Sequence, residues 1–206
     1  MPLDAGGDVD DDVALLSLAE RERFGVRAGL VARRFARAHA GLRRIVAEYQ
    51  GVAPRAVEMV APYGRAPRTA VGDLELSLSH SDGVALVAVA STPVGVDLEA
   101  VAVADGAGDD LESMAELTLS PRELARFRAT ATEAQARFWL RSWTRKEAWL
   151  KAHDRGISEQ ALCEVDVSAE SVDAHTLIDL APAGPFVGAI AVAHPRARVV
   201  WKELHP

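Results

Sequence analysis

The sequence predicts an α+β fold built from two similar halves in a pseudo-twofold arrangement. Segments with apolar residues at helical spacing are followed by short segments that are either wholly apolar or apolar at every second residue, as is typical of strands. The same order occurs twice, since a helical segment precedes apolar strands in LVARRFARAHAGL with VALVAVA and again in FWLRSWTRKEAWL with FVGAIAVAH. We therefore expect each half to run from a helix into strands.

The 206 residues divide into three parts. Residues 1–14 are expected to form an acidic N-terminal tail, residues 15–101 the N-terminal half and residues 102–206 the C-terminal half. The tail has five aspartates among its first 12 residues, and no basic residue balances them. Such a segment is expected to stay in solvent rather than join a packed core.

The elements of the N-terminal half follow from caps, spacing and turns. Ser17 and Glu20 match the S-x-x-E capping box, so a helix is expected from there to about Tyr49. Glycines and prolines then interrupt the chain between residues 51 and 67. Strands are expected at 74–78, 84–90 and 94–98.

The C-terminal half begins with residues 102–112, which are small and acidic and are expected to form a surface loop. Ser120, Pro121 and Glu123 mark a second capped helix start. A long helix is expected over 133–152. Further strands are expected at 162–167, 174–180, 186–194 and 199–204.

The composition excludes several classes of protein. The chain is 49% hydrophobic, which is enough for a core. Its longest apolar runs are about eight residues, against the ~20 that span a bilayer, so no membrane segment is expected. The N-terminus lacks the basic and apolar regions of a secretory signal. Cys163 is the single cysteine, so we expect a protein of the reducing cytoplasm.

The net charge of −7 argues against bulk attraction to nucleic acid. Residues 20–44 depart from this balance, with eight arginines and two glutamates and hence a local charge of +6. Two interpretations stay open for this segment. It is either a solvated helix whose arginine stems cover apolar neighbours, or a patch that faces an anion.

Two carboxylates end one of the expected strands. Asp97 and Glu99 in VGVDLE lie two residues apart, so their side chains project from the same face. Neighbouring carboxylates repel each other unless a cation or a proton lies between them. An exposed pair of this kind is often only solvent-facing, but this pair ends a buried strand, where ligand sites tend to be built.

The long helix over 133–152 carries a row of residues four apart, Trp139, Trp143, Glu147 and Lys151. Glu147 and Lys151 alone would form an ordinary salt bridge along the helix. The row passes from aromatic to charged, as expected for a helix that leaves the core at the wall of a site. His80 follows a strand between two serines, and is either a turn histidine or a site residue.

Other common chemistry is absent from the sequence. It contains no Walker loop, no G-x-G-x-x-G motif and no G-x-S-x-G elbow. The remaining histidines have no zinc-ligand spacing among them.

Three motifs taken together resemble the surfactin-type 4′-phosphopantetheinyl transferases. They are SHS at 79–81, GVDLE at 95–99 and WTRKEAWLK at 143–151, in the family's order. The resemblance reaches back to the arginine-containing segment ARRFARAHAGLR and covers the chain from about Ser17 to its C-terminus. It implies the 4′-phosphopantetheinyl transferase fold, with two similar α+β halves and the active site between them.

Three features depart from the family's pattern. Only the acidic tail precedes Ser17, where the family has a first β-strand, so that strand is expected to be missing. Arg65 in GRAP stands where the family has the lysine of G-K-P, and it would meet a phosphate with a planar fork rather than a point charge. Asp154 replaces a glycine shortly after Lys151, which is expected to stiffen the backbone there.

The resemblance implies transfer of the 4′-phosphopantetheine arm of coenzyme A to a serine of an apo acyl or peptidyl carrier protein, with release of adenosine 3′,5′-bisphosphate. It implies Mg²⁺, or Mn²⁺, at the pyrophosphate and a setting in secondary-metabolite biosynthesis. The carrier is expected to dock beside the cleft, on residues 20–44 or 113–135. Two joined halves would complete a site in one chain, so a monomer is expected, without nucleic-acid or membrane partners.

The resemblance also implies roles for individual residues. Asp97, Glu99 and Glu147 are expected to hold the metal. Glu147 and Lys151 are expected to be catalytic. Glu147, or a water that it orients, would take the serine proton, and Lys151 would offset phosphate charge. Coenzyme A is expected to be bound by Arg23, Arg34, Arg65, Ser79, His80, Lys146 and Lys151.

Two other functions stay open on the sequence alone. A Mg²⁺-dependent phosphohydrolase could use the same three carboxylates with water as the acceptor. An inactive relative that binds coenzyme A could keep the fold without the chemistry. The intact set of Asp97, Glu99, Glu147 and Lys151 argues against the inactive relative, because a degenerate copy would be free to lose these residues.

Overall fold

The computed structural model contains two four-stranded antiparallel sheets, and it describes residues 1–4, 6–60, 67–70, 74–105 and 108–204. The first sheet has the order β1 (Met59–Val60), β2 (Arg68–Thr69), β3 (Glu75–Ser81), β4 (Val84–Ala90). The second has the order β5 (Val94–Ala100), β8 (Phe186–Val192), β7 (His175–Leu180), β6 (Ser171–Val172).

Helices lie outside both sheets. Two long ones dominate, α3 (Gly29–Gln50) and α7 (Thr132–Ala152). The shorter ones are α1 (Val9–Leu15), α2 (Leu18–Gly25), α4 (Val101–Asp105), α5 (Leu111–Thr118), α6 (Pro121–Ala129) and α8 (Glu159–Glu164), with 3₁₀ turns at Pro54–Ala56 and Gly108–Asp110. The predicted α+β class is confirmed. Both predicted capping boxes, at Ser17 and Ser120, are also present.

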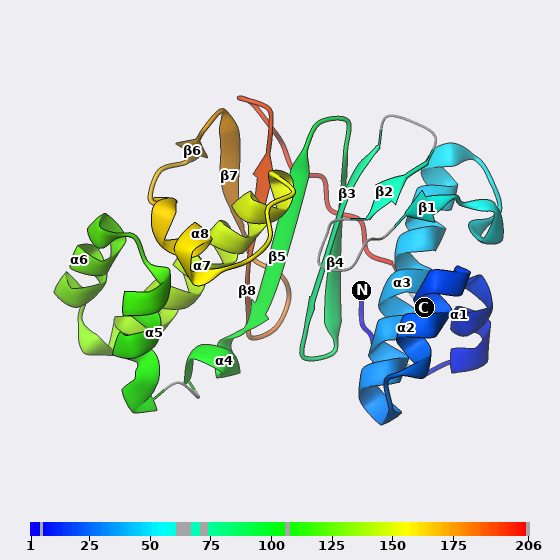
Figure 1. Cartoon of the computed structure of the whole chain (residues 1–206), viewed down its shortest axis with the longest axis horizontal. Coiled ribbons are helices and arrows are strands. Elements are labelled where there is room, and N and C mark those ends of the chain that lie inside the picture. Colours follow the sequence, from blue (N-terminus) through cyan, green and yellow to red (C-terminus); the bar gives the residue numbers. More distant parts are fainter. Residues whose placement is uncertain (5, 61–66, 71–73, 106–107, 205–206) are drawn as a thin grey trace.

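The molecule is layered as helix, sheet, sheet, helix (Figure 1). Leu76 of β3 packs against Leu42 and Val46 of α3, so α3 covers the outer face of the first sheet. Residues of α7 pack on Ala189 and Ala191 of β8, so α7 covers the outer face of the second. The inner faces meet through an apolar cluster of both sheets, which includes Leu86, Ala88, Val94, Val96 and Leu98.

The expectation of an N-terminal tail is wrong. Residues 9–15 form helix α1, and Asp12 is only 4% exposed because it pairs with Arg37 and Arg44 of α3. Leu3 is buried, and a backbone bridge joins Pro2 to Val84 at the edge of β4. The first strand of the family was expected to be missing. In its place, the first three residues pair briefly with the edge of β4.

Other boundaries differ for identifiable reasons. The first long helix is two helices, α2 and α3, and Gly29 at the start of α3 has φ +55°. The expected strand at 162–167 is instead helix α8, which Ser158 caps by accepting from the Ala161 N–H. Residues 199–204 contain no strand. The expectation of a loop at 102–112 is wrong for its described residues, which lie in α4, in the 3₁₀ turn at Gly108–Asp110 and at the start of α5.

β5 belongs to the second sheet, although a division at residues 101 and 102 would assign it to the N-terminal half. It pairs with β8 in the register Val94↔Val192 through Ala100↔Phe186. The change from one sheet to the other therefore falls in the turn at residues 91–93. No described helix has the length and apolar character needed to span a membrane.

Candidate active site

Close packing of α7 on β5 creates the candidate site. Gly95 has no side chain, and the backbone of Ala148 and Ala152 occupies the space where a Cβ would lie. The helix can therefore lie directly on the strand. This contact brings Glu147 and Lys151, one helical turn apart, over Asp97 of the strand.

Asp97 is the centre of the site and is 1% exposed. Its Oδ1 lies 2.6 Å from the Lys151 Nζ and accepts a 2.8 Å hydrogen bond from the Ser79 hydroxyl. The same ammonium lies 3.2 Å from Glu147 Oε2. Lys151 thus bridges two buried carboxylates as their internal cation.

The charges in this cluster strongly affect each other. Burial, together with repulsion from Asp97, raises the pKa of Glu147 to about 7. Burial alone would lower the pKa of Lys151, but attraction to Asp97 and Glu147 outweighs it, so the pKa is raised. Lys151 therefore stays protonated at neutral pH, whereas Glu147 can exchange its proton there.

Glu99 lies beside this cluster. Its Oε2 accepts a 3.0 Å hydrogen bond from the Ser81 hydroxyl. Burial, and then repulsion from Asp97, raises the pKa of Glu99. The predicted row of residues along α7 is confirmed, since the Trp139 and Trp143 rings lie 5.5 Å apart and Glu147 pairs with Lys151 one turn further on.

The donor chemistry of these carboxylates fits a hard cation such as Mg²⁺. Asp97 Oδ2 is buried and accepts no hydrogen bond from any described residue, so one oxygen is available for a ligand. Among the described residues, however, no three acidic, histidine or cysteine side chains already form a metal-binding group. Glu99 faces Ser81, and the Lys151 ammonium holds Asp97 Oδ1. Metal binding at Asp97 therefore requires the Lys151 ammonium to move away from Oδ1.

His80 and Arg34 extend the site toward the β3–β4 turn. Partial loss of solvent, and then repulsion from His39, Lys151 and Arg34, lowers the pKa of His80. The Arg34 guanidinium makes two hydrogen bonds to Asp4, of 2.8 and 2.5 Å, and lies 3.6 Å from Asp82. An anion entering here would meet a positive region but would compete with Asp4.

Arg23 on α2 has two buried donors, Nε and Nη2, without a hydrogen-bond partner among the described residues. Its guanidinium lies over the Phe35 ring at 5.4 Å, and the Phe35 ring lies 4.2 Å from that of His39. Unsatisfied buried donors are costly, so they favour an anionic ligand at this place. Arg65 lies outside the described residues.

Comparison with known proteins decides the family. The model of the 4′-phosphopantetheinyl transferase superfamily matches residues 93–193. Over 174 residues the chain is 34% identical to the 4′-phosphopantetheinyl transferase HetI of Nostoc sp., which covers 78% of this chain and 71% of HetI. It is 29% identical over 118 residues to a 4′-phosphopantetheinyl transferase of Bacillus subtilis, covering 57% of this chain and 50% of that protein.

The chain belongs to the 4′-phosphopantetheinyl transferase superfamily. The part matched by the family model contains β5 and α7, and therefore Asp97, Glu99, Glu147 and Lys151. The alignment with HetI is longer and extends beyond that part. The two-layered pair of sheets, each covered by a long helix, agrees with this superfamily's α+β fold.

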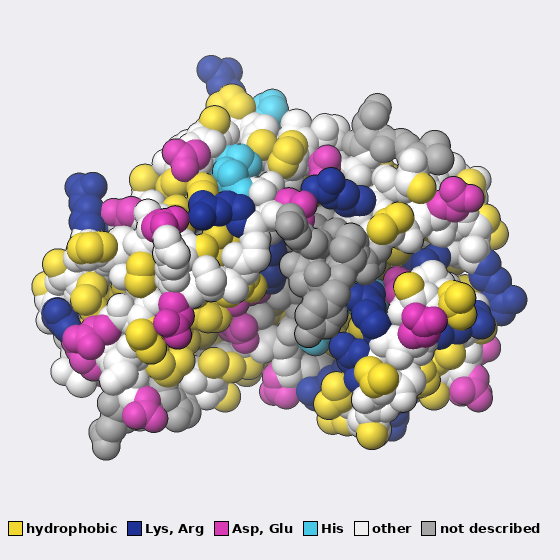
Figure 2. Space-filling view, viewed as in Figure 1, with side chains coloured by type: hydrophobic (Ala, Val, Ile, Leu, Met, Phe, Trp, Pro, Cys, Tyr) yellow, Lys and Arg dark blue, Asp and Glu magenta, His cyan; other side chains and the backbone are white. Residues whose placement is uncertain are grey.

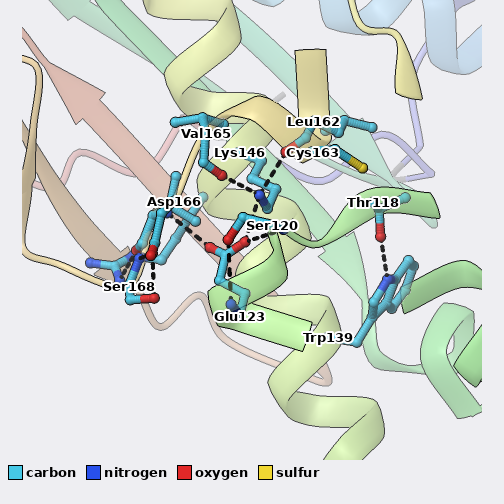
Figure 3. A network of polar contacts seen from close by, with 12 residues as sticks. Thr118, Ser120, Glu123, Trp139, Lys146, Leu162, Cys163, Val165, Asp166 and Ser168 are labelled. Carbon is cyan, nitrogen blue, oxygen red and sulfur yellow. Dashed lines mark hydrogen bonds and ion pairs between the residues drawn. The ribbon is translucent and has the colours of Figure 1, made fainter. Parts of the chain in front are cut away.

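Lys146 does not belong to the site of this transferase, so its expected contact with coenzyme A is wrong. Its side chain is 0% exposed and points toward Glu123 of α6, as Figure 3 shows. Its ammonium lies 2.6 Å from Glu123 Oε2 and donates to the carbonyl oxygens of Leu162 and Val165. Lys146 therefore ties α7 to α6 and α8 and has no donor left for a phosphate.

Some residues near the transferase site were not assigned from sequence. Ser81 bonds Glu99, and the alternation in SLSHS places it on the same face of β3 as Ser79, so the strand period could have found it. Asp4 could not be found in this way, because 30 residues separate it from Arg34. Asp154 adopts the left-handed φ of +50° that suits a glycine, and it pairs with Arg68 at 2.7 Å.

A separate cavity of about 560 Å³ lies in the N-terminal part of the chain. Its lining includes Leu16, Arg21, Arg43, Val57 and Met59. None of the residues that line it is a predicted site residue. Arg21 and Arg43 are held by carbonyl oxygens and by Glu20, so the cavity is not part of the acidic site.

Proposed function

We propose that this superfamily member is a surfactin-type enzyme. It transfers the 4′-phosphopantetheine arm of coenzyme A to a serine hydroxyl of an apo acyl or peptidyl carrier protein. The observation that carries the proposal is the buried cluster of Asp97, Glu147 and Lys151, in a chain whose relatives are named 4′-phosphopantetheinyl transferases. Adenosine 3′,5′-bisphosphate is the second product.

The reaction exchanges one phosphorus–oxygen bond for another. The serine oxygen of the carrier forms a bond to the phosphorus that bears the pantetheine arm. The bond from that phosphorus to the bridging oxygen breaks, and adenosine 3′,5′-bisphosphate leaves with this oxygen. The serine proton passes to Glu147, whose pKa of about 7 suits proton transfer near neutral pH.

Asp97, Glu99 and Glu147 would hold Mg²⁺ or Mn²⁺, which when bound supplies positive charge to the pyrophosphate and the leaving group. Lys151 then turns from Asp97 toward a phosphate oxygen, where its charge serves the same purpose. This exchange of partners is supported by the side-chain exposure of Lys151, 22% against 2% for Asp97. A phosphate oxygen could therefore reach the lysine more readily than the aspartate.

The remaining positive groups would bind the distal phosphates of coenzyme A. Arg23 offers two donors unsatisfied by any described residue, and Arg34 would bind a phosphate in place of Asp4 at the β3–β4 turn. His80 lies within electrostatic reach of both Arg34 and Lys151. Ser79 is already bonded to Asp97 and to the Leu98 N–H, so its role is to hold Asp97 rather than to bind coenzyme A directly.

The carrier would dock on a surface formed by α2 and the start of α3. The exposed apolar residues there are Leu18, Val26, Leu30 and Val31. Arg21, Arg27 and Arg33 have no carboxylate partner among the described residues, whereas Arg37, Arg43 and Arg44 are paired internally. Figure 2 shows basic and hydrophobic side chains together over this part of the molecule. The combination suits an acidic helical partner.

Mass spectrometry of apo carrier proteins after incubation with the enzyme, coenzyme A and Mg²⁺ tests this function. A gain of one phosphopantetheine on a serine, with equimolar adenosine 3′,5′-bisphosphate, is expected. Release of free phosphate or free phosphopantetheine without carrier modification would indicate a phosphohydrolase instead. Binding of coenzyme A with neither product would indicate an inactive relative.

A further inference from the structure

The three serines of β3 form a regular row that faces β5. Strand alternation puts Ser77, Ser79 and Ser81 on one side of β3, whereas Leu76 on the other side packs against α3. Ser77 and Ser79 are buried, although a serine in a buried strand has no packing advantage over alanine. The hydroxyl groups of the row are therefore expected to make hydrogen bonds.

Partners for these hydroxyl groups lie along the free edge of β5. β5 is the edge strand of the second sheet and pairs with β8 on one side. The N–H groups that point to its other side, at every second residue, meet no neighbouring strand of this sheet. The N–H groups of Val96, Leu98 and Ala100 instead donate to the serine hydroxyls of Ser77, Ser79 and Ser81. The three distances are 3.0, 3.3 and 3.0 Å respectively. This serine ladder joins the two sheets where backbone pairing stops.

A serine hydroxyl has one proton and two lone pairs, so an oxygen that accepts from a backbone N–H can still donate its proton to one acceptor. Ser81 gives its proton to Glu99 Oε2 at 3.0 Å, and Ser79 gives its proton to Asp97 Oδ1 at 2.8 Å. Ser77 has the same bond to the backbone but donates to no carboxylate in the part of the chain that the structure describes. The ladder therefore has two rungs that hold acidic side chains and one that does not.

We propose that Ser81 is a positioning residue for the metal site, which holds the Glu99 carboxylate in register with Asp97 through the edge of β5. This inference rests on the proposed function, because it assigns to Glu99 the binding of Mg²⁺. A ligand held by a second hydrogen-bonded group loses less freedom when the metal binds, and removing such a group typically lowers metal affinity by about 10- to 100-fold.

The test compares Ser81→Ala with Ser77→Ala, which removes an equivalent rung without touching a carboxylate. Mg²⁺ affinity is measured by calorimetry on the protein saturated with coenzyme A, alongside the thermal midpoint of each variant. We expect Ser81→Ala to weaken Mg²⁺ binding by about 10-fold or more. Ser77→Ala should lower the midpoint by a similar amount but change Mg²⁺ affinity less than twofold. Ser81→Thr, which keeps the hydroxyl, should restore the wild-type affinity.

Equal Mg²⁺ affinities for the two alanine variants would overturn the positioning role, and the proposed function would stand if carrier modification continued. Wild-type protein that binds coenzyme A but no Mg²⁺ would overturn both. If Ser81→Ala fails to fold, Ser81→Cys replaces it, because a thiol keeps the size but bonds weakly. Mg²⁺ affinity of Ser81→Cys equal to that of Ser81→Thr would then count against the proposal.

Discussion

A Cβ atom on Gly95 would lie 1.9 Å from the carbonyl oxygen of Ala148 and 2.5 Å from the backbone nitrogen of Ala152. No side-chain rotation can relieve such a contact, because both atoms belong to the backbone of α7. The absence of a side chain at this one position therefore sets the distance between β5 and α7. That distance in turn sets the contact between Asp97 and Lys151.

Gly95→Ala is expected to push α7 away from β5 and to lower the free energy of unfolding by about 3 kcal/mol. Transfer activity should fall more than the folded fraction does, because Glu147 and Lys151 move with the helix. Gly25→Ala is the control, since nothing lies within 4 Å of a Cβ at that position. Urea denaturation and single-turnover transfer would be measured on both. Wild-type stability in Gly95→Ala would show that the contact does not constrain the helix.

Lys146→Met is expected to lower the free energy of unfolding by about 3–5 kcal/mol, because Glu123 would be left as a buried, unpaired charge. Lys146→Met combined with Glu123→Gln should recover part of this loss, since the glutamine carries no charge. The KM for coenzyme A of the folded enzyme should stay within about twofold of wild type. A raised KM with unchanged stability would mean that Lys146 does bind coenzyme A.

Glu20 gives the fold a dependence on acid. Its hydrogen bonds and its pairing with Arg43 outweigh burial and lower its pKa to about 2. Because this pKa lies below the ordinary value of about 4.5, the stabilisation is complete above pH 4.5 and is lost as the pH falls toward 2. This contribution to the free energy of unfolding is about 3 kcal/mol. Glu20→Gln should unfold more easily at pH 7 and show a flatter stability profile between pH 5 and 2. Parallel profiles for both proteins would contradict this.

Much of the fold and part of the site could be predicted from local sequence. Capping boxes, strand alternation and the row from Trp139 to Lys151 depend on neighbours within a few residues. Helix geometry could also have excluded Lys146, because a rotation of about 100° per residue turns it away from the face of Glu147.

What the sequence could not predict depends on distant partners. Helix α1 is stable because Asp12 meets Arg37, 25 residues away, and composition alone favours a tail there. Asp4 reaches Arg34 across 30 residues. The partner of a surface arginine is set by tertiary packing, so the segment 20–44 mixes structural arginines with arginines that have no carboxylate partner among the described residues. Periodicity cannot separate the two kinds.

Arg33→Glu is expected to slow carrier modification by about 10-fold at low salt and much less at 0.5 M salt, because salt screens a surface charge. Its fold should be unaffected. Arg37→Glu is the contrasting variant, since it would face Asp12 in a buried pair and should destabilise the protein instead. Rates would be followed with a fixed, acidic carrier protein. A rate for Arg33→Glu that does not depend on salt would place the docking surface elsewhere, with residues 113–135 the next candidate.

Glu147→Gln separates proton transfer from metal binding. The wild-type Glu147 has a pKa of about 7, raised by burial and by Asp97, so it is increasingly ionised as the pH rises through 7. Transfer by the wild type should therefore increase over this range, and the half-saturating Mg²⁺ concentration should fall, because the metal competes with the proton. Glutamine keeps the size but can neither accept the serine proton nor offer a charged oxygen to the metal, and the expected loss of transfer rate is about 10³-fold.

The comparison for Glu147→Gln is Asp97→Ala, since it removes a proposed ligand and also the charge that raises the Glu147 pKa. If Glu147 is the base, higher pH should restore Glu147→Gln in part and added Mg²⁺ or Mn²⁺ should not. Rescue by metal alone would make Glu147 a ligand only, and near-normal transfer by both variants at limiting Mg²⁺ would rule out the carboxylate site.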